Sequence, residues 1–319
     1  MTQHINLPNC IVAQSGGPTV AINASLVGVI CASIGHYGTV YGSINGILGI
    51  LNQHYLNLTE LAASGKDTLQ RLATTPAMYL GSCRYKLKDY HEDASDYEKI
   101  FAQFKALNIK AFFYIGGNDS MDTVLKLSSY ADSIGSNIQI IGIPKTIDND
   151  LWGTDITFGF QSAVDVAANV IDYIHSTATS HGRVFIVEVM GHKVGWLTLH
   201  AGIAAGADIV LLPEIPYDIR RVGAAIQRRR KQGKSFSILA VAEGALSKEE
   251  AKLGKKALAA ARAQESYPSI AYRLAEELEP YVGTETRVCV PGHFQRGGPP
   301  CPYDRMLATM LGAAAARLI

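Results

Sequence analysis

The sequence has no excess of charge of either sign, since 29 lysine and arginine residues stand against 28 aspartate and glutamate residues over 319 positions. No overall field is available to attract nucleic acid or an anionic membrane, and we expect neither as a partner. The five cysteines form no close pair, which argues against a disulfide framework or a structural zinc site and favours a reducing cytoplasm.

Long apolar runs are also missing. No stretch approaches the roughly 20 residues needed to span a bilayer, and the opening MTQHINLPNC lacks the regions of a secretory signal. We find no internal repeat and no low-complexity linker. With 48% hydrophobic residues, the chain is expected to be a soluble, unprocessed cytoplasmic protein with a large core, in two domains or one large α/β unit.

Short apolar runs recur, and each ends abruptly in glycine, proline or charged residues. They lie at 11–13, 111–115, 140–143, 184–189, 209–212, 238–242 and 288–290. Segments with helical spacing separate them, such as 97–107 and 163–174. This alternation predicts an α/β fold with parallel sheets, whose ligands bind beyond the carboxyl ends of the strands. The polar clusters of the sequence stand at those ends.

Three charged or terminal segments are interpreted as helix. The stretch 247–263, rich in Lys, Glu and Ala, predicts a solvated helix, and 306–319 predicts another helix. The basic run 228–231 is better explained as a solvated helix end than as an effector site.

Two glycine turns follow predicted strands. The segment 114–120, YIGGNDS, stands between a strand and a helix expected to begin near Met121, where backbone N–H groups and the helix dipole favour a phosphate. An ordinary turn capped by Asp119 or Ser120 is the alternative. The segment 14–18, QSGGP, is a second such turn.

The segment 144–150, PKTIDND, places a cation, a hydroxyl and two carboxylates in one loop after a buried strand. Phosphoryl transfer needs a carboxylate for the attacking hydroxyl, a ligand for Mg²⁺ and cations for the moving phosphoryl group. An Asx-rich turn would explain Asp148 and Asn149 but not Lys145.

Further candidates lie near strand ends or glycine clusters. Arginine suits phosphate through its planar fork, although each of these alone is better explained as a surface salt bridge. Glu243 could accept hydrogen bonds from sugar hydroxyls or cap the turn at Gly244. The phosphate-binding candidates are Arg84, Arg183, Arg287, His293 and Arg296.

In this order, SGG, GSCR, GGNDS, PKTIDND, VEVMGHKVG, PEIP, EGA, PGHFQRGG and PYDR resemble the phosphofructokinase family, from Ile11 to the C-terminus. The resemblance implies two Rossmann-like three-layer α/β/α domains with mainly parallel sheets and an active site in the cleft between them. Residues 1–159 with 294–319 would bind the phosphoryl donor and Mg²⁺, and residues 160–293 the sugar phosphate.

The resemblance also implies residue roles. Asp148 would be the general base on the 1-hydroxyl of fructose 6-phosphate, with Thr146 beside it and Arg84 bridging donor and acceptor. The implied metal ligands are Asp119, Asp150 and Asn118. The implied donor site is Gly17, Gly117, Asn118, Asp119, Ser120 and Lys145. The implied sugar-phosphate site is Arg183, Met190, Gly191, His192, Glu243, Arg287, His293 and Arg296.

In the family some of these arginines come from a neighbouring subunit, so a homodimer or homotetramer with a shared active site is implied. The chain departs from the family at Asn118, where many relatives have aspartate, and at His192, where an arginine is usual. Both changes bear on the rate.

Family members that use ATP carry glycine at the positions of Asp119 and Lys145. A carboxylate at Asp119 would meet the α-phosphate of ATP, and like charges about 4 Å apart repel by roughly 1 kcal/mol in water and about 4 at an intermediate dielectric. Lys145 offers a compact charge to pyrophosphate. We therefore expect reversible phosphoryl transfer from pyrophosphate to fructose 6-phosphate, giving fructose 1,6-bisphosphate and phosphate in glycolysis or gluconeogenesis. The alternatives are an ATP-dependent enzyme and a catalytically silent sugar-phosphate-binding subunit.

Overall fold

The computed structural model describes residues 7–264 and 266–319, which form two compact units. Unit 1 takes the chain up to Thr146, Leu151–Gln161 and Arg296–Ile319. Unit 2 takes Ile147–Asp150 and Ser162–Gln295. The assignment of one domain to the donor and the other to the sugar phosphate stays a prediction.

Unit 1 contains a five-stranded sheet in the order β3-β2-β1-β4-β5. Its strands are β1 (Asn9–Gln14), β2 (Val40–Ser43), β3 (Tyr55–Asn57), β4 (Ile109–Gly116) and β5 (Gln139–Pro144). All neighbours pair in parallel except β2 and β3, which are antiparallel. The strand order reverses between β1 and β4, and ligands of open α/β sheets bind at such a point.

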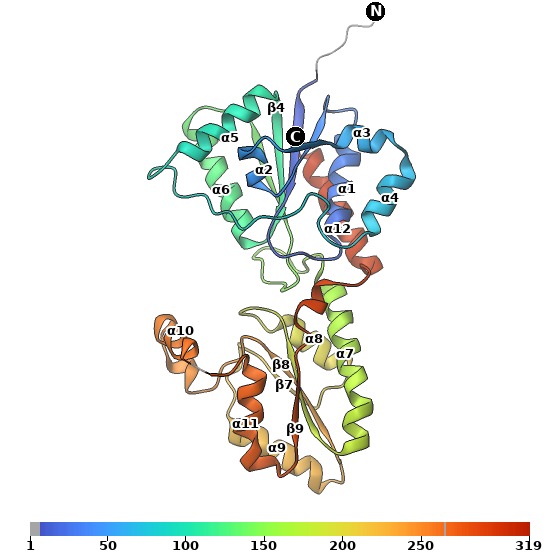
Figure 1. The fold of residues 1–319 in the computed structure, drawn as a ribbon, viewed down its shortest axis with the longest axis vertical. Helices are drawn as coiled ribbons and strands as arrows, with labels where there is room; N and C mark the ends of the chain where they lie inside the picture. Colours follow the sequence, from blue (N-terminus) through green and yellow to red (C-terminus); the bar gives the residue numbers. More distant parts are fainter. Residues whose placement is uncertain (1–6, 265) are drawn as a thin grey trace, which may run out of the picture. The chain divides into compact units, whose positions relative to one another are not determined.

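Helices cover both faces of this sheet (Figure 1). Val12 and Phe113 pack in one core with α1 and α12, whereas Ile11 and Phe112 pack in the other with α5 and α6. Alternate strand residues point to opposite faces, so both sets are apolar. The helices of this unit are α1 (Ile22–Ser33), α2 (Ile47–Leu51), α3 (Leu58–Ala63), α4 (Lys66–Thr74), α5 (Ser95–Ala106), α6 (Asn118–Ser133) and α12 (Pro302–Arg317).

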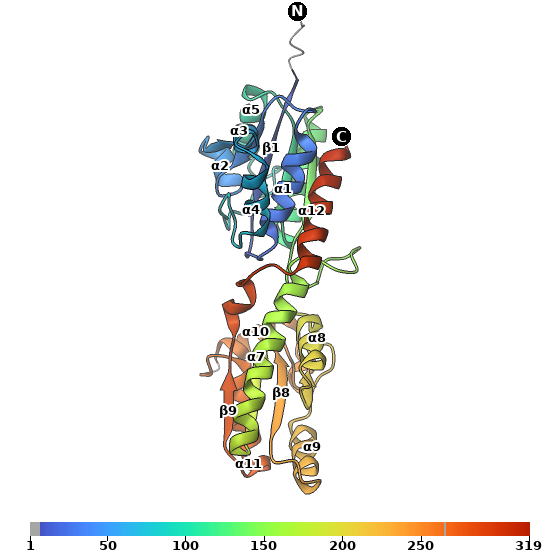
Figure 2. The ribbon, with the colours of Figure 1, turned by 90° about the vertical axis from the view of Figure 1, so that its right-hand side faces the viewer.

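Helices α1 and α12 lie side by side and touch through glycine (Figure 2). A Cβ added at Gly28 would stand 2.2 Å from the backbone oxygen of Thr309, and one at Gly312 would stand 2.0 Å from the oxygen of Ser25. Both are well inside van der Waals contact. The two backbones approach so closely only because these side chains are absent.

Unit 2 contains a four-stranded parallel sheet in the order β7-β8-β6-β9. Its strands are β6 (Val184–Val189), β7 (Ile209–Leu211), β8 (Ser237–Ala242) and β9 (Thr286–Cys289). Helix α9 (Ile219–Lys231) and helix α11 (Ile270–Val282) share a core with alternate strand residues such as Ile186 and Leu239. Helices α7 (Phe160–His181) and α8 (Trp196–Ala204) meet where His175 Nε2 lies 2.8 Å from the oxygen of Ala205.

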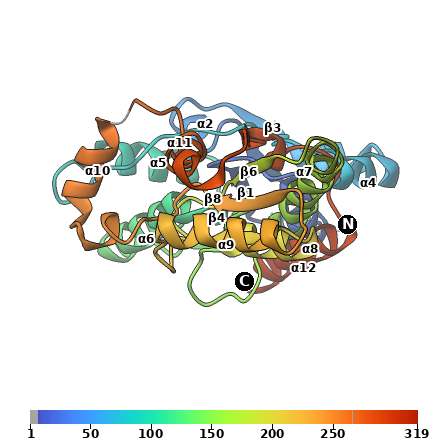
Figure 3. The same ribbon diagram turned by 90° about the horizontal axis from the view of Figure 1, so that it is seen from below.

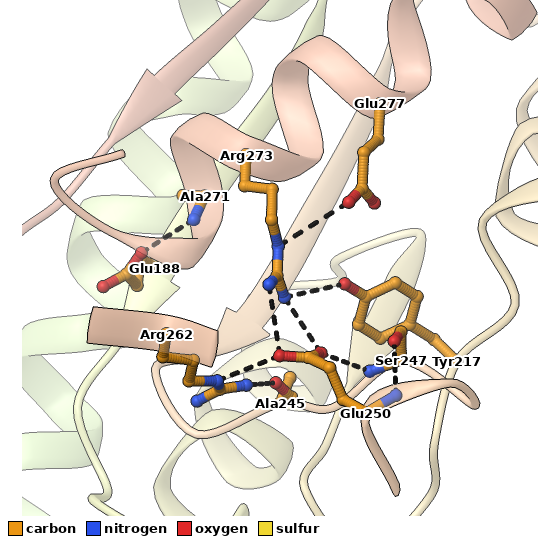
Figure 4. A network of polar contacts seen from close by, with 9 residues as sticks. All are labelled: Glu188, Tyr217, Ala245, Ser247, Glu250, Arg262, Ala271, Arg273 and Glu277. Atoms are coloured by element: carbon orange, nitrogen blue, oxygen red, sulfur yellow. Dashed lines mark hydrogen bonds and ion pairs between the residues drawn. The ribbon is translucent and has the colours of Figure 1, made fainter. Parts of the chain in front are cut away.

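Helix α10 (Lys255–Ala263) is set apart from the sheet of unit 2 and contributes no buried residue (Figure 3). The 3₁₀ turn η1 (Glu250–Lys252) precedes it, and Glu250 anchors the segment (Figure 4). The Glu250 carboxylate accepts hydrogen bonds from Arg262 Nε at 2.9 Å and from Arg273 at 3.0 and 3.1 Å. The backbone N–H of Ser247 donates to it at 2.8 Å.

The Glu250 network corrects the interpretation of 247–263 as one solvated helix. The side chain of Glu250 is only 12% exposed. Burial opposes its ionisation, but the hydrogen bonds from Arg273, Ser247 and Arg262 outweigh burial and lower its pKa to about 2. The segment is a 3₁₀ turn and a short helix joined by a charged anchor.

The predicted α/β class is confirmed, and so is strand structure at all seven predicted runs. The helices expected within 97–107, 163–174 and 306–319 are present, and the basic run 228–231 ends α9. Strands β2 and β3 were not predicted. Within 7–264 and 266–319, every helix falls short of the length or the apolarity that a bilayer crossing requires.

Candidate active site

Three loops converge at the carboxyl edge of the unit 1 sheet, because β4 lies between β1 and β5. They are the turn after β1, the turn after β4 and the start of the segment after β5. The backbone N–H of Lys145 donates to the oxygen of Gly116 at 2.9 Å, and that of Ser15 donates to Ile115 at 2.9 Å. Two predicted phosphate turns and the predicted donor lysine therefore share one edge.

Lys145 is buried to 4% exposure between the two glycine turns. Its Nζ donates to the oxygen of Gly17 at 2.6 Å. A Cβ placed at Gly16 would stand 3.3 Å from this Nζ, and one at Gly117 would stand 3.9 Å from it. The ammonium thus binds the backbone of the first turn and lies near the second turn, where its charge would neutralise a bound phosphate.

Arg296 lies against the first glycine turn. A Cβ at Gly17 would stand 2.9 Å from its guanidinium, so a larger residue at this position would displace the arginine. Gly16 has φ +81°, a conformation that L side chains rarely adopt. Sequence reasoning placed Arg296 on the sugar-phosphate side, whereas in unit 1 it flanks the predicted donor turn. It brings a second cation to that edge.

The second glycine turn leads into α6, whose N-cap is Gly117. No side chain caps the helix, so neither Asp119 nor Ser120 is the cap that the alternative interpretation required. The helix begins at Asn118, three residues before the predicted start. The side chain of Ser120 points back to Gly116 instead. Its Oγ would lie only 2.0 Å from a Cβ placed at that glycine.

Asp119 lies in the first turn of α6, with its side chain 77% exposed. Its Oδ1 is 2.9 Å from Lys86 Nζ. A hydrogen bond to Asp119, reinforced by the opposite charge, raises the pKa of Lys86. The carboxylate expected to repel ATP therefore has a neighbouring cation that sequence reasoning missed.

The segment that carries Arg84 is tied to the first glycine turn. Ser82 Oγ donates to the oxygen of Gly16 at 2.8 Å, and the backbone N–H of Leu80 donates to Gln14 Oε1 at 2.9 Å. Arg84 itself is exposed. These bonds hold the predicted bridging arginine beside the predicted donor turn.

The loop 146–150 carries the predicted base and one predicted metal ligand. Thr157 Oγ1 donates to the backbone oxygen of Thr146 at 2.8 Å, and Asn149 adopts φ +56°, which asparagine tolerates better than most residues. Asp148 and Asp150 are partly buried. The backbone of the loop is thus constrained on both sides of Asp148.

No group of three or more His, Cys, Asp or Glu side chains in the described part of the chain could form a metal cage. Mg²⁺ does not need one, because it is usually held by one or two carboxylates, water and substrate phosphates. Asn118 and Asp119 present oxygen atoms at an exposed helix start. Such donors fit Mg²⁺ in its usual open coordination.

At the carboxyl edge of the unit 2 sheet, Glu243 orders the turn after β6. One oxygen of its carboxylate, Oε1, accepts the N–H groups of Gly191 at 3.2 Å and His192 at 2.5 Å. The same turn is held at Met190, whose N–H donates to Gln295 Oε1 at 3.3 Å. His293 is exposed in the 3₁₀ turn η2 (Gly292–Arg296). Met190, Gly191, His192 and Glu243 thus come together.

Arg183 and Arg287 lie at the opposite, amino edge of the same sheet. Arg183 precedes β6, Arg287 is the second residue of β9, and Arg287 pairs with Phe185 across the two strands. Six residues of β6 at about 3.3 Å each separate Arg183 from Met190 by roughly 20 Å. Within one chain, one sugar phosphate cannot contact both groups.

A single carboxylate joins these two arginines. Glu285 Oε2 is 2.7 Å from Arg183 Nε, and Glu285 Oε1 forms an ion pair with Arg287 Nη2. Sequence reasoning missed Glu285, Lys86 and Gln295. Gln295 stands inside the PGHFQRGG segment, next to Arg296, and Glu285 lies two residues before Arg287, whereas no motif includes Lys86.

The fold and these edges define a class: an α/β protein with two sheets, in which one switch point presents two glycine turns, a buried lysine and an arginine suited to phosphate. The family model "Phosphofructokinase" matches residues 9–319. The chain belongs to the phosphofructokinase family.

Particular relatives differ in the donor that their names give. The chain is 41% identical over 316 residues to an ATP-dependent 6-phosphofructokinase of Spirochaeta thermophila, covering 97% of this chain and 83% of the relative. It is 40% identical over 312 residues to ATP-dependent 6-phosphofructokinase 3 of Bacteroides thetaiotaomicron, and the match covers 97% of this chain and 84% of that relative. The crystal structure of a pyrophosphate-dependent phosphofructokinase from Nitrosospira multiformis matches with a TM-score of 0.83 and 30% identity, covering 98% of this chain and 76% of that one.

Proposed function

We propose that the protein transfers a phosphoryl group reversibly from pyrophosphate to the 1-hydroxyl of fructose 6-phosphate. The observation that carries the proposal is the position of Lys145, whose buried ammonium binds the oxygen of Gly17 in the first glycine turn and lies near Gly117 in the second. Arg296 adds a second cation at the first of these turns. Two cations and two glycine turns at a switch point suit a compact, highly charged anion.

In this proposal, Asp148 accepts the proton of the attacking 1-hydroxyl, and Thr146 lies next to the base. The terminal phosphoryl group of pyrophosphate forms a bond to that oxygen as its bond to the leaving phosphate breaks, and Arg84 stabilises the charge in transit. Mg²⁺ held by Asp150, Asn118 and Asp119 would neutralise the pyrophosphate oxygens. Lys145 and Arg296 would neutralise the remaining negative charge of the pyrophosphate.

The sugar phosphate is proposed to bind at a site completed by a second copy of the chain. Met190, Gly191, His192, Glu243 and His293 would hold the sugar, and Arg183 and Arg287 of the other copy would hold its 6-phosphate. The distance between the sugar-binding residues and the two arginines, which lie at opposite edges of one sheet, supports this assignment to two copies. A site shared in this way would require a homodimer or homotetramer for turnover.

An ATP-dependent reaction is the second candidate, and one observation favours it. The Asp119 side chain is 77% exposed and paired with Lys86, so solvent and a cation both screen the charge that would repel the α-phosphate. The named donor of the Spirochaeta thermophila relative points the same way. We prefer pyrophosphate as the donor because Lys145 is buried at the glycine turns, where its charge attracts an anion more strongly than in water.

The deciding experiment is a steady-state assay of the purified protein with fructose 6-phosphate and Mg²⁺, supplied with pyrophosphate or ATP in parallel. We expect turnover with pyrophosphate. Turnover with ATP alone would sink the donor assignment. Absence of turnover with both donors, with fructose 6-phosphate still bound, would support the silent sugar-phosphate-binding subunit.

Two variants separate the donor residues. Asp119→Gly should raise the ratio of ATP to pyrophosphate turnover roughly fivefold, since about 1 kcal/mol of repulsion is removed. Asp119→Gly combined with Lys145→Gly should raise it further by weakening pyrophosphate binding. Lys99→Met, which removes an exposed lysine of α5, is the control for a lost positive charge.

A further inference from the structure

We propose that Glu285 is a positioning residue that holds Arg183 and Arg287 as one preformed receptor for the phosphate of the sugar substrate. The inference rests on the proposed function, because that function gives the arginines their ligand. It adds a residue that neither touches the substrate nor takes part in proton transfer.

The backbone places the three residues together. Strands β6 and β9 are parallel neighbours, and the N–H of Val184 donates to the oxygen of Glu285 at 3.3 Å. Arg183 and Glu285 each stand one residue before a strand, so their side chains leave the sheet at the same edge. The arginines meet the two different oxygens of one carboxylate.

Electrostatics explain why an acidic residue is needed there. Two guanidinium groups close enough to share a carboxylate repel each other strongly when no anion separates them. Glu285 cancels one of the two positive charges and leaves the pair with a net charge of about +1. Without it the arginines would separate into solvent, because the side chains of Arg183 and Arg287 are 30% and 52% exposed.

The carboxylate leaves the arginines able to bind a phosphate. An arginine has five N–H donors, and Glu285 occupies Nε of Arg183 and one Nη group of Arg287. Several donors on each guanidinium remain for the oxygens of a phosphate monoester. A receptor that is ordered before binding spends less free energy on ordering its side chains during binding.

The acidic surroundings of Glu285 offer a matched control. A hollow between α11 and β9 is lined by Glu276, Glu279 and Glu285 together with Tyr272 and Thr286. Glu279 is exposed, and no ion pair or hydrogen bond joins it to Arg183 or Arg287. Glu279→Gln removes the same charge from the same neighbourhood and leaves the arginine pair intact.

The test compares wild type, Glu285→Gln and Glu279→Gln by calorimetric titration with fructose 6-phosphate in the absence of donor, and by steady-state kinetics. Glu285→Gln should raise the Kd and the KM for fructose 6-phosphate about tenfold, as expected for the loss of a charge-assisted hydrogen bond. The kcat and the KM for the donor should change less than twofold. Glu279→Gln should leave all four values within twofold of wild type.

Tighter binding by Glu285→Gln would show that the carboxylate competes with the substrate phosphate, and unchanged binding would show that the arginines need no positioning. Either result overturns the proposal, as does a fall in Tm without a change in Kd, which marks a merely structural role. Binding of fructose 6-phosphate without turnover of any donor would sink the proposed reaction and still leave the effect of Glu285 measurable. A wild-type protein that binds no fructose 6-phosphate would overturn both.

Discussion

Two residues that bear on donor choice, Lys145 and Asp119, lie in opposite surroundings. Lys145 is 4% exposed and bound to the oxygen of Gly17, whereas the Asp119 side chain is 77% exposed and bound to Lys86. Coulomb interactions are stronger where water is excluded, so the attraction exerted by Lys145 exceeds the repulsion exerted by Asp119. If pyrophosphate is the donor, as we propose, its binding at this edge should depend mainly on the lysine.

Asp148 is the residue whose loss should affect the chemical step most. Asp148→Asn removes the proton acceptor while keeping the shape of the side chain, so kcat should fall by roughly 10² to 10⁴-fold. The Kd for fructose 6-phosphate should stay within about threefold of wild type. Rapid-quench kinetics and calorimetry provide the two measurements.

Asp172→Asn, on the exposed surface of α7, is the matched control and should leave kcat unchanged. A kcat for Asp148→Asn within tenfold of wild type would remove Asp148 from the role of base. A parallel loss of fructose 6-phosphate affinity would instead assign it to binding.

The predictability of the candidate site differs from residue to residue. Lys145 was identifiable because a lysine inside an Asx-rich turn has no role in forming the turn. Lys86 was not, because an isolated lysine in a loop carries no pattern, and its meaning comes from Asp119 some distance along the chain. Glu285 became visible only when the parallel pairing of β6 and β9 placed it between two arginines.

Among the elements of unit 1, α1 and α12 cross in close contact. Gly28→Ala would gain about 1 kcal/mol of helix propensity but would force a methyl group to within 2.2 Å of Thr309. Overpacking costs typically 1 to 3 kcal/mol, and backbone atoms give way less readily than side chains, so we expect a net loss of up to about 2 kcal/mol. Thermal unfolding followed by calorimetry measures it.

Gly254→Ala, at the N-cap of α10, controls for the loss of glycine's backbone freedom without a steric clash. Nothing lies within 4 Å of a Cβ at Gly254, whose φ is −68°. Its Tm should stay near that of wild type. A Gly28→Ala protein as stable as this control would mean that the two helices can move apart without loss.

The anchor of the α10 segment gives a pH-dependent prediction. The pKa of Glu250 is lowered from an ordinary 4.5 to about 2 in the folded protein, so its stabilising contribution is complete above pH 4.5 and is lost as the pH falls toward 2. A shift of this size corresponds to about 3 kcal/mol. At pH 7, Glu250→Gln should be less stable by an amount of this order.

The difference in stability between wild type and Glu250→Gln should therefore shrink when urea unfolding is measured at falling pH. Asp122→Asn is the control, because it removes an exposed i,i+4 pair with Lys126 and should cost less than about 0.5 kcal/mol. A difference that stays constant with pH would mean that packing, and not charge, accounts for the loss.

Elements were predictable where a single periodicity dominated. The seven runs ending in glycine, proline or charge became strands because helices bury both faces of most of them. Strands β2 and β3 escaped prediction because they are only four and three residues long, and β2 includes Gly42. The segment 247–263 was misread because its Lys, Glu and Ala content hides the one buried carboxylate, Glu250.

At the scale of the whole molecule, the two edges of the unit 2 sheet give a test of shared sites. A chain with Arg287→Ala lacks part of the phosphate receptor that we propose it provides to its partner, and a chain with Asp148→Asn lacks its own proposed base. Each alone should be nearly inactive. After mixing and reassembly, a two-fold dimer that pairs at random should recover roughly a quarter of wild-type activity, since half the dimers keep one complete site.

The measurement is specific activity before and after the two variant chains are dissociated in mild urea and dialysed together. As a control, Asp148→Asn is mixed with wild type, and the mixture is taken through the same urea and dialysis steps. The specific activity of this control shows how much activity is lost during reassembly. No recovery in the mixed sample, with full recovery of treated wild type, would place Arg287 and Asp148 in the site of one chain.

The contact between α1 and α12 also fixes an order of events during synthesis. Unit 1 closes with a helix that begins at Pro302, whereas unit 2 is complete at Gln295. Domains generally fold as they emerge from the ribosome, so unit 2 can fold while the apolar side of α1 still lacks its partner. The unit whose translation begins first thus becomes complete last, and until then the apolar side of α1 lacks the helix that covers it.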